Sequence, residues 1–97
     1  MTLRWDRRAL QDLKDIHSYV AANSSPGSAE RVRRHLRNRT DLLASSPLLG
    51  VASSNPSIRV LFPTRYPYRI YYTVQGDEVV ILHIRHTARR TPDDLLP

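Results

Sequence analysis

Apolar side chains recur every three or four residues in the first half of the chain, which is the period of an amphipathic α-helix. Asp6 and Ser25 stand just before the two stretches with this period, where a side-chain oxygen can accept hydrogen bonds from free backbone N–H groups. Pro26 suits the first position of the second helix, which needs no N–H donor. Because only a few residues separate the stretches, we expect an antiparallel helical hairpin over about residues 6–46. The expected buried positions are Ala9, Leu13, Ile16 and Val20, followed by Ala29, Val32, Leu36, Thr40 and Leu43.

β-Branched and aromatic residues replace this period after Ser57 and predict extended strands. The run at 79–84 is almost continuously apolar, so we expect it to be the most buried strand, central in the sheet. Helices followed by antiparallel strands are typical of an α+β fold. We therefore predict an N-terminal strand and an antiparallel helix hairpin packed on a three- to four-stranded antiparallel sheet at about 57–86. The expected strands are 2–5, 58–62, 68–74 and 79–84.

Gly76 and Asp77 predict a two-residue turn between the last two strands, which fixes their register. With this turn Tyr72 faces Ile81, and directly opposed residues share a face of the sheet. One face then carries Tyr68, Ile70, Tyr72, His83 and Arg85. The other carries Arg69, Tyr71, Thr73, Val80, Leu82, Ile84 and His86. A slip of one residue would change this assignment, and the pattern leaves open which face meets the helices.

The length of 97 residues fits a single domain over 1–97 that ends in a C-terminal tail at 87–97. The 15 Lys and Arg against 9 Asp and Glu give a net charge of +6, and every basic residue except Lys14 is arginine. Arginine binds phosphate or carboxylate through a planar, permanently charged fork and is a poor general base. The charge therefore indicates an anionic partner, either nucleic acid or an acidic protein.

Several classes of protein are excluded by what the sequence lacks. With no cysteine, the chain forms no disulfide, Cys-ligated zinc site, iron–sulfur cluster or catalytic thiol. No apolar run reaches the roughly 18 residues of a membrane span, and the first residues lack the apolar region of a signal peptide. His83 and His86 should point to opposite faces of a strand, which makes them a poor metal pair. We expect a cytoplasmic protein with no metal, cofactor or membrane contact.

An ordered set of segments from about Leu3 to Arg90 resembles the ParE branch of the RelE/ParE toxin superfamily. No single motif is specific, but their order and spacing are similar to those of the family. The matching segments are Trp5-x3-Ala9-x2-Asp12-Leu13-x2-Ile16-x2-Tyr19-Val20, Pro47-x2-Gly50, Arg59, Tyr66-Pro67-Tyr68-Arg69-Ile70-Tyr71-Tyr72-Thr73-Val74 and Ile81-Leu82-His83-Ile84-Arg85-His86-x2-Arg89.

The resemblance implies a bacterial type II toxin that a cognate antitoxin silences in a hetero-oligomer. The antitoxin is expected to be a small dimeric DNA-binding protein. Within the superfamily, ParE-like toxins act on DNA gyrase, whereas RelE-like toxins cleave mRNA in the ribosomal A site. The resemblance also implies a helix hairpin on an antiparallel sheet.

Metal-free RNA cleavage needs a base, an acid and cations for the developing phosphorane charge. In this chain Arg59, Arg65, His86 and Arg89 are the candidates for such chemistry. The sheet lysines and the tail tyrosine of the RelE pattern are missing, so the acid–base set is incomplete. We therefore expect a gyrase-inhibiting, target-binding toxin rather than an enzyme. The alternatives are a ribosome-dependent mRNA endonuclease and a family member that only binds antitoxin.

The candidate binding residues form two groups, each with a plain structural alternative. Helix-two arginines can simply be a solvated face, strand tyrosines can be core residues, and His86 can bond to backbone at the end of its strand. Asp12 and Asp15 are read as surface partners of the nearby arginines, without a catalytic role. The expected target-binding residues are Arg65, Arg69, Arg85, His86, Arg89 and Arg90. The expected antitoxin-binding residues are Arg31, Arg34, Arg37, Tyr66 and Tyr68.

Overall fold

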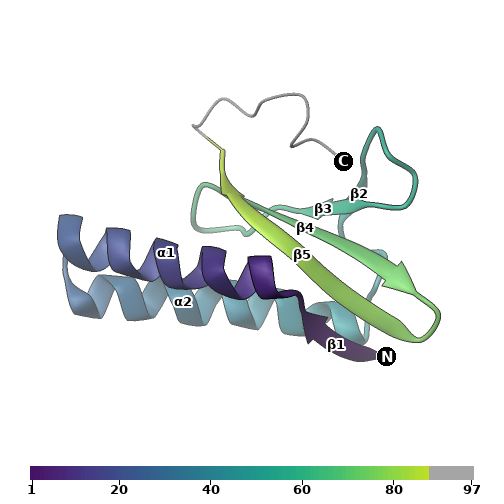
Figure 1. Ribbon diagram of the computed structural model, residues 1–97, viewed down its shortest axis with the longest axis horizontal. Coiled ribbons are helices and arrows are strands. Elements are labelled where there is room, and N and C mark those ends of the chain that lie inside the picture. The colour runs from purple at the N-terminus through teal and green to yellow at the C-terminus, as the bar shows by residue number, and fades with distance from the viewer. Residues whose placement is uncertain (88–97) are drawn as a thin grey trace.

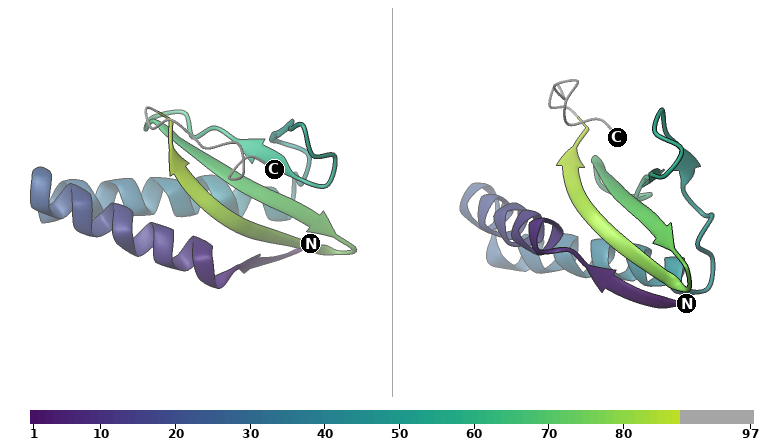
Figure 2. Two further views of the ribbon diagram at one scale, coloured as in Figure 1. Left: turned by 45° about the horizontal axis from the view of Figure 1, so that its top comes forward. Right: turned by 45° about the vertical axis from the view of Figure 1, so that its right-hand side comes forward.

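The computed structural model describes residues 1–87 and shows a helical hairpin packed against one face of a β-sheet (Figure 1). The predicted α+β class is confirmed. Figure 2 shows both helices on the same side of the curved sheet, with the first strand leading directly into the first helix. In chain order the elements are β1 (Thr2–Trp5), α1 (Arg7–Asn23), α2 (Pro26–Asp41), the 3-10 helix η1 (Leu42–Ala44), β2 (Val51–Ala52), β3 (Arg59–Leu61), β4 (Tyr68–Gln75) and β5 (Glu78–His86).

The helical hairpin forms as its hydrophobic period predicts. Pro26 is the first residue of α2, and the Ser25 hydroxyl oxygen accepts a hydrogen bond from the backbone N–H of Ser28 at 3.0 Å. Asp6 occupies the N-cap position of α1, but its side chain accepts no capping hydrogen bond, so that detail of the prediction is wrong. The apolar stripes of both helices contribute to one core. Its helical members include Ala9, Leu13, Val32, Leu36 and Leu43.

The sheet has five strands in the order β1-β5-β4-β3-β2, so the prediction of three to four antiparallel strands is corrected. β1 pairs with β5 in parallel, from Thr2 opposite Glu78 to Trp5 opposite Ile81. The central strand is β4 rather than β5. β5 still has a neighbour on each side over residues 78–81, which accounts for the apolar run that suggested a central position.

The register between β4 and β5 follows the prediction near the turn and departs from it farther along. Gln75 pairs with Glu78 and Tyr72 with Ile81, but the next pair is Tyr71 with His83. A β-bulge places Leu82 outside the ladder, and every later residue of β5 changes face.

The two faces of the sheet therefore differ from the predicted assignment beyond Ile81. Tyr68, Ile70 and Tyr72 share the helix-facing core with Ile81 and Ile84. Because side chains alternate along a strand, the opposite face carries Arg69, Tyr71, Thr73, His83 and Arg85. The prediction had grouped His83 and Arg85 with Ile70, and Ile84 and His86 with Arg69.

Candidate functional site

Two arginines lie directly opposite each other on the sheet face that points away from the helices. Arg69 of β4 pairs with Arg85 of β5. Like charges at opposed positions destabilise a sheet. Within residues 1–87 the ion pairs involve only the carboxylates of Glu30 and Glu78, so neither arginine is neutralised by an ion pair there. The guanidinium carbon of Arg69 lies 5.9 Å from the ring centroid of Phe62. This pair is suited to receive an anionic group from a partner.

An aromatic stack adjoins the arginine pair on the same face. The rings of Tyr71 and His83 lie 4.4 Å apart between centroids and are inclined by 13°. Burial, together with the charges of Arg8 and Arg85, lowers the pKa of His83 to about 4. Its imidazole is therefore neutral near pH 7. The buried Nδ1 atom has no hydrogen-bond partner within the described residues, so His83 is half-buried as expected but not fully satisfied.

His86 lies on the helix-facing side of β5, opposite to Arg85. Its ring meets the ring of Tyr68 edge to face, with centroids 5.2 Å apart. Both residues line a cavity of about 290 Å³ between α1 and the end of β5. Arg85 also lines this cavity, although its side chain belongs to the opposite face of β5. Of the predicted target-binding residues, the structure therefore brings Arg69, Arg85 and His86 to one end of the β4–β5 hairpin, on different faces.

Asp12 joins α1 to β5 and is not a simple surface partner of arginine. Its Oδ2 atom accepts a hydrogen bond at 2.9 Å from the backbone N–H of Ile84, beyond the point where β1 ends. Burial raises the pKa of Asp12, while the bond from Ile84 and the charges of Arg8 and Arg85 oppose that shift. Asp15, in contrast, accepts a bond from Gln11. Both carboxylates line the same cavity as His86.

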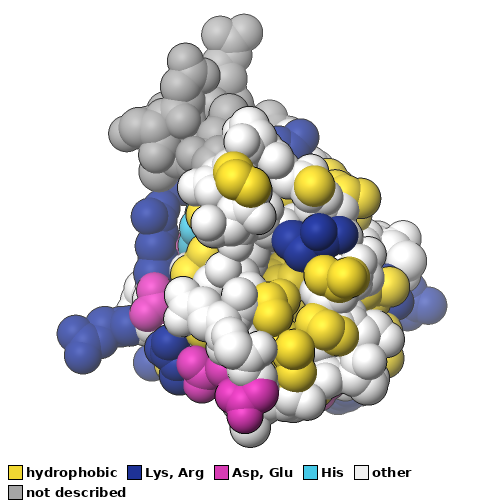
Figure 3. Space-filling view, turned by 90° about the vertical axis from the view of Figure 1, so that its right-hand side faces the viewer, with side chains coloured by type: hydrophobic (Ala, Val, Ile, Leu, Met, Phe, Trp, Pro, Cys, Tyr) yellow, Lys and Arg dark blue, Asp and Glu magenta, His cyan; other side chains and the backbone are white. Residues whose placement is uncertain are grey.

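Arg59 holds the loop before β2 through hydrogen bonds to its backbone. One of its terminal nitrogens donates to the carbonyl oxygens of Gly50 at 2.6 Å and Leu48 at 3.3 Å. The same loop exposes a group of apolar side chains: Leu48 is 68% exposed, Leu49 44% and Val51 54%. Figure 3 shows hydrophobic side chains gathered on this face around a basic group. Arg59, which belongs to the family pattern, therefore helps to fix the conformation of this loop.

The predicted antitoxin-binding residues fall into two places around α2. Arg31, Tyr66 and Tyr68 line one groove together with Val20 and Val32. Arg37 points toward α1 instead, with its guanidinium carbon 5.4 Å from the ring centroid of Trp5. Arg34 is exposed on α2. A partner that contacted all of these residues would have to cross the helix.

His35, which was not among the predicted site residues, packs against Tyr66. The ring of His35 meets the Tyr66 ring edge to face at 5.3 Å between centroids. Burial and the nearby charges of Arg65 and Arg39 lower the pKa of His35. Arg65 itself is exposed. The signal for His35 was its position between Val32 and Leu36, next to the apolar stripe of α2.

Two predicted residues, Arg89 and Arg90, lie outside the described residues. Over residues 1–87 no group of three or more His, Asp or Glu side chains could hold a metal ion. In the same part of the chain, the helices are too short or too polar to cross a bilayer.

The fold is shared with small toxins of the RelE/ParE type. A family model described as "ParE toxin of type II toxin-antitoxin system, parDE" matches residues 3–91. The chain belongs to this ParE toxin family, and its partner is therefore an antitoxin. It is similar to a protein of Sinorhizobium fredii (strain NBRC 101917 / NGR234) named "Putative toxin Y4kP", with 33% identity over 93 residues, 96% of this chain and 95% of the relative.

Solved structures agree with this assignment. The chromosomal ParDE system of P. aeruginosa contains a chain with a TM-score of 0.81 and 27% identity, over 89% of this chain and 95% of that one. The isolated E. coli RelE toxin gives a TM-score of 0.68 at 19% identity, over 92% and 86% of the two chains. The second likeness shows a common fold.

Proposed function

We propose that this toxin inhibits DNA gyrase by binding it, and that a small dimeric DNA-binding antitoxin neutralises it in a cytoplasmic hetero-oligomer. The gyrase contact would involve the arginine pair of the sheet and the basic residues around the end of β5. These are Arg65, Arg69, Arg85, His86, Arg89 and Arg90.

The observation that carries the proposal is the dispersal of the groups that RNA cleavage would need. Arg59 is engaged by backbone carbonyls, and His86 faces Tyr68 on the other side of the strand from Arg69. His83 shares a face with the arginines, but its lowered pKa leaves it a weak base. The cavity beside His86 is also lined by Asp12 and Arg85, but the Oδ2 atom of Asp12 is engaged by the backbone N–H of Ile84. Binding explains such a surface better than catalysis does.

The antitoxin contact is proposed on α2 and the segment before β4. The groove lined by Arg31, Tyr66 and Tyr68 offers one cation beside two aromatic rings. Tyr68 is 7% exposed, so its contribution would be the rim of the ring, while Tyr66 is the more accessible of the two. Aromatic and arginine side chains often dominate the binding energy of protein interfaces.

The second candidate function is ribosome-dependent mRNA cleavage. It is favoured by the unpaired Arg69 and Arg85, which could clamp a phosphodiester, and by the fold shared with E. coli RelE. His86 or His83 would then have to supply the proton transfer.

Purified toxin tested against both targets distinguishes these functions. Inhibition requires that gyrase lose supercoiling activity, or accumulate cleaved plasmid, in proportion to added toxin. The nuclease alternative requires unchanged gyrase together with A-site cuts in mRNA on programmed ribosomes. If toxin expressed without its antitoxin leaves both assays and cell growth unchanged, the chain only binds antitoxin.

A further inference from the structure

The sheet has an open edge at β2. Among residues 1–87 this strand is last in the sheet order and pairs only with β3, through Val51 opposite Val60 and Ala52 opposite Arg59. Backbone N–H and C=O groups alternate in direction along a strand, so one of the two β2 residues directs both of its groups away from β3. The β2 edge can therefore form backbone hydrogen bonds with a further strand.

Exposed apolar side chains accompany this open edge. They belong to Leu48 and Leu49, just before β2, and to Val51 within it. Val51 lies on the sheet face that carries Val60 and Tyr71, because directly paired residues share a face. Figure 3 looks onto this end of the molecule and shows the hydrophobic side chains gathered there. An exposed apolar group of this kind is typical of an interaction surface.

The segment that contains β2 carries no charge. Residues 42–58 include no Asp, Glu, Lys, Arg or His, although 25% of the chain is charged. Natural edge strands are commonly protected by charged side chains or by proline, which keep a second strand away. Pro47 and Pro56 stand outside β2. No charged side chain of this segment, and no proline in the strand itself, opposes pairing with another strand.

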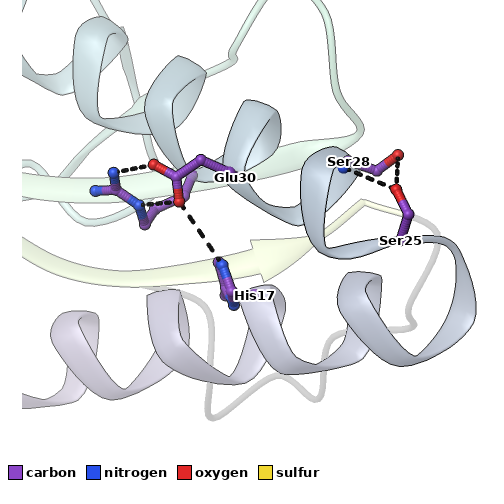
Figure 4. A network of polar contacts seen from close by, with 5 residues as sticks. His17, Ser25, Ser28 and Glu30 are labelled. Carbon is purple, nitrogen blue, oxygen red and sulfur yellow. Dashed lines mark hydrogen bonds and ion pairs between the residues drawn. The ribbon is translucent and has the colours of Figure 1, made fainter.

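The ionic contacts of the described residues lie elsewhere. Figure 4 shows Glu30 of α2 facing His17 of α1, with 3.8 Å between Oε2 and Nε2. Arg4 and Glu78 form an ion pair at 3.2 Å between β1 and β5, at the other edge of the sheet. Arg59, which follows the uncharged segment, donates to carbonyl oxygens of the loop before β2. A partner that recognises this basic protein by charge therefore gains little at the β2 edge.

We propose that a second copy of this chain covers the β2 edge. Two chains with a net charge of +6 repel each other, and the uncharged segment at 42–58 lets them approach where that repulsion is weakest. The edge is also self-complementary, because two identical strand edges related by a two-fold axis can pair antiparallel. The dimer then has one sheet that continues across the axis, with Leu48, Leu49 and Val51 of both copies beside it.

This interface is small, because β2 has only two residues. It buries less surface than the interfaces of stable complexes, so we expect a dissociation constant of about 10–100 µM. The inference depends neither on the proposed antitoxin contact nor on the toxin's target.

Sedimentation equilibrium of the full-length toxin without antitoxin, at about 1–500 µM, tests the proposal. The average mass should rise from 11.2 kDa toward twice that value. Raising NaCl from about 0.1 M to about 0.5 M should strengthen the association about two- to fivefold, because salt screens the repulsion between two cationic chains. A mass of 11.2 kDa at every concentration would overturn the proposal. So would a dimer that weakens in salt, because charge would then hold it together.

Cysteine cross-linking locates the interface, since the chain has no cysteine of its own. Antiparallel pairing across a two-fold axis at β2 places residue 51 or residue 52 opposite itself, about 4.5–5.5 Å apart between Cα atoms. That distance suits a disulfide. Either Val51→Cys or Ala52→Cys should therefore form a covalent dimer with oxidised glutathione, whereas Leu10→Cys, an exposed position on α1, is the matched control. Cross-linking of neither β2 variant above the control level would refute this pairing.

A charge placed on the edge separates the possible occupants. Val51→Lys should weaken dimerisation at least about tenfold, because two lysines then face each other across the axis. Leu10→Lys should leave dimerisation unchanged, and circular dichroism confirms that both variants are folded. If the wild type is monomeric and Val51→Lys instead weakens antitoxin binding or gyrase inhibition, the edge serves that partner, and the inference is wrong.

Discussion

The hydroxyl of Tyr72 joins the central strand to the loop before β2 by accepting a hydrogen bond from the backbone N–H of Gly50 at 2.9 Å. The same hydroxyl donates to the carbonyl oxygen of Pro47 at 2.8 Å. The loop thus closes over a buried phenol, which explains the need for glycine. A Cβ atom at residue 50 would lie 2.7 Å from the Tyr72 ring and from the carbonyl oxygen of Val60.

Gly50→Ala should therefore destabilise the protein by about 1–3 kcal/mol, the usual cost of overpacking a buried site. The free energy of unfolding from urea titration is the measurement. Gly27→Ala is the matched control, because its Cβ would meet only ordinary contacts at 3.6 Å or more in α2. We expect that control to raise stability by about 0.5–1 kcal/mol through better helix propensity. Equal stability of the two variants would contradict this account of the loop.

His83 should make the fold less stable in mild acid. Its pKa is about 4 in the folded protein against 6.5 for a free imidazole, so the unfolded chain binds the proton more tightly. The stabilisation is complete above pH 6.5 and is lost as the pH falls toward 4. His83→Phe keeps a ring beside Tyr71 but cannot titrate. As the pH falls from 6.5 toward 4, the unfolding free energy of the wild type should fall steadily relative to that of this variant. A constant difference would show that the stacked histidine is not responsible.

Asp12 should contribute a pH dependence of the opposite sign. Its pKa is raised above 3.8 in the folded state, so the folded protein holds the proton more tightly than the unfolded chain. This contribution to stability is lost as the pH rises from 3.8 through the raised pKa. Asp12→Asn should abolish this component while its amide oxygen still accepts the bond from Ile84. Asp12→Ala should cost about 1–3 kcal/mol at neutral pH, because the Ile84 N–H is then unpaired. Equal unfolding free energies for the Asn and Ala variants would refute the role of this hydrogen bond.

The arginine pair should matter for toxicity and little for folding. We expect Arg69→Ala combined with Arg85→Ala to abolish growth arrest and gyrase inhibition. The unfolding free energy should stay within about 1 kcal/mol of wild type, because two opposed like charges do not stabilise the sheet. Antitoxin binding, measured by calorimetry, should be retained. The alanine variants of Arg85, His86 and Arg89, each made separately, should relieve toxicity in the same way. Persistent toxicity in all of them would move the target contact elsewhere.

The helical hairpin could be predicted because its apolar residues follow one period and its second helix begins with a serine–proline signal. β1 could be located, but its parallel partner could not, since a four-residue strand carries no information about pairing. The bulge at Leu82 was missed because the run from Val79 to Ile84 is apolar at every position but one. The opposed arginines Arg69 and Arg85 gave no help, because like charges argue against direct pairing.

The candidate site was predictable in its residue types and less so in its geometry. The hydrogen bond between Asp12 and Ile84 had a signal in the sequence. Asp12 stands three residues after Ala9 and four before Ile16, so it lies on the helix face that packs against the sheet. The role of Arg59 depends on loop carbonyls that no local pattern reveals. Arg31 and Arg37 lie on different sides of α2, because a separation of six residues is not a whole number of helical turns.

The pairing of β1 with β5 has a consequence for how the toxin is made. β1 is synthesised before its neighbour, residues 78–81 of β5, and β5 also pairs with β4. The two helices can pair earlier, through contacts close in sequence, whereas the long-range pairing of β1 must wait until β5 has been made. A product terminated before β5 leaves a gap between β1 and β4, with Arg85 and His86 missing. Premature translation products of this gene should therefore be harmless to the cell that makes them.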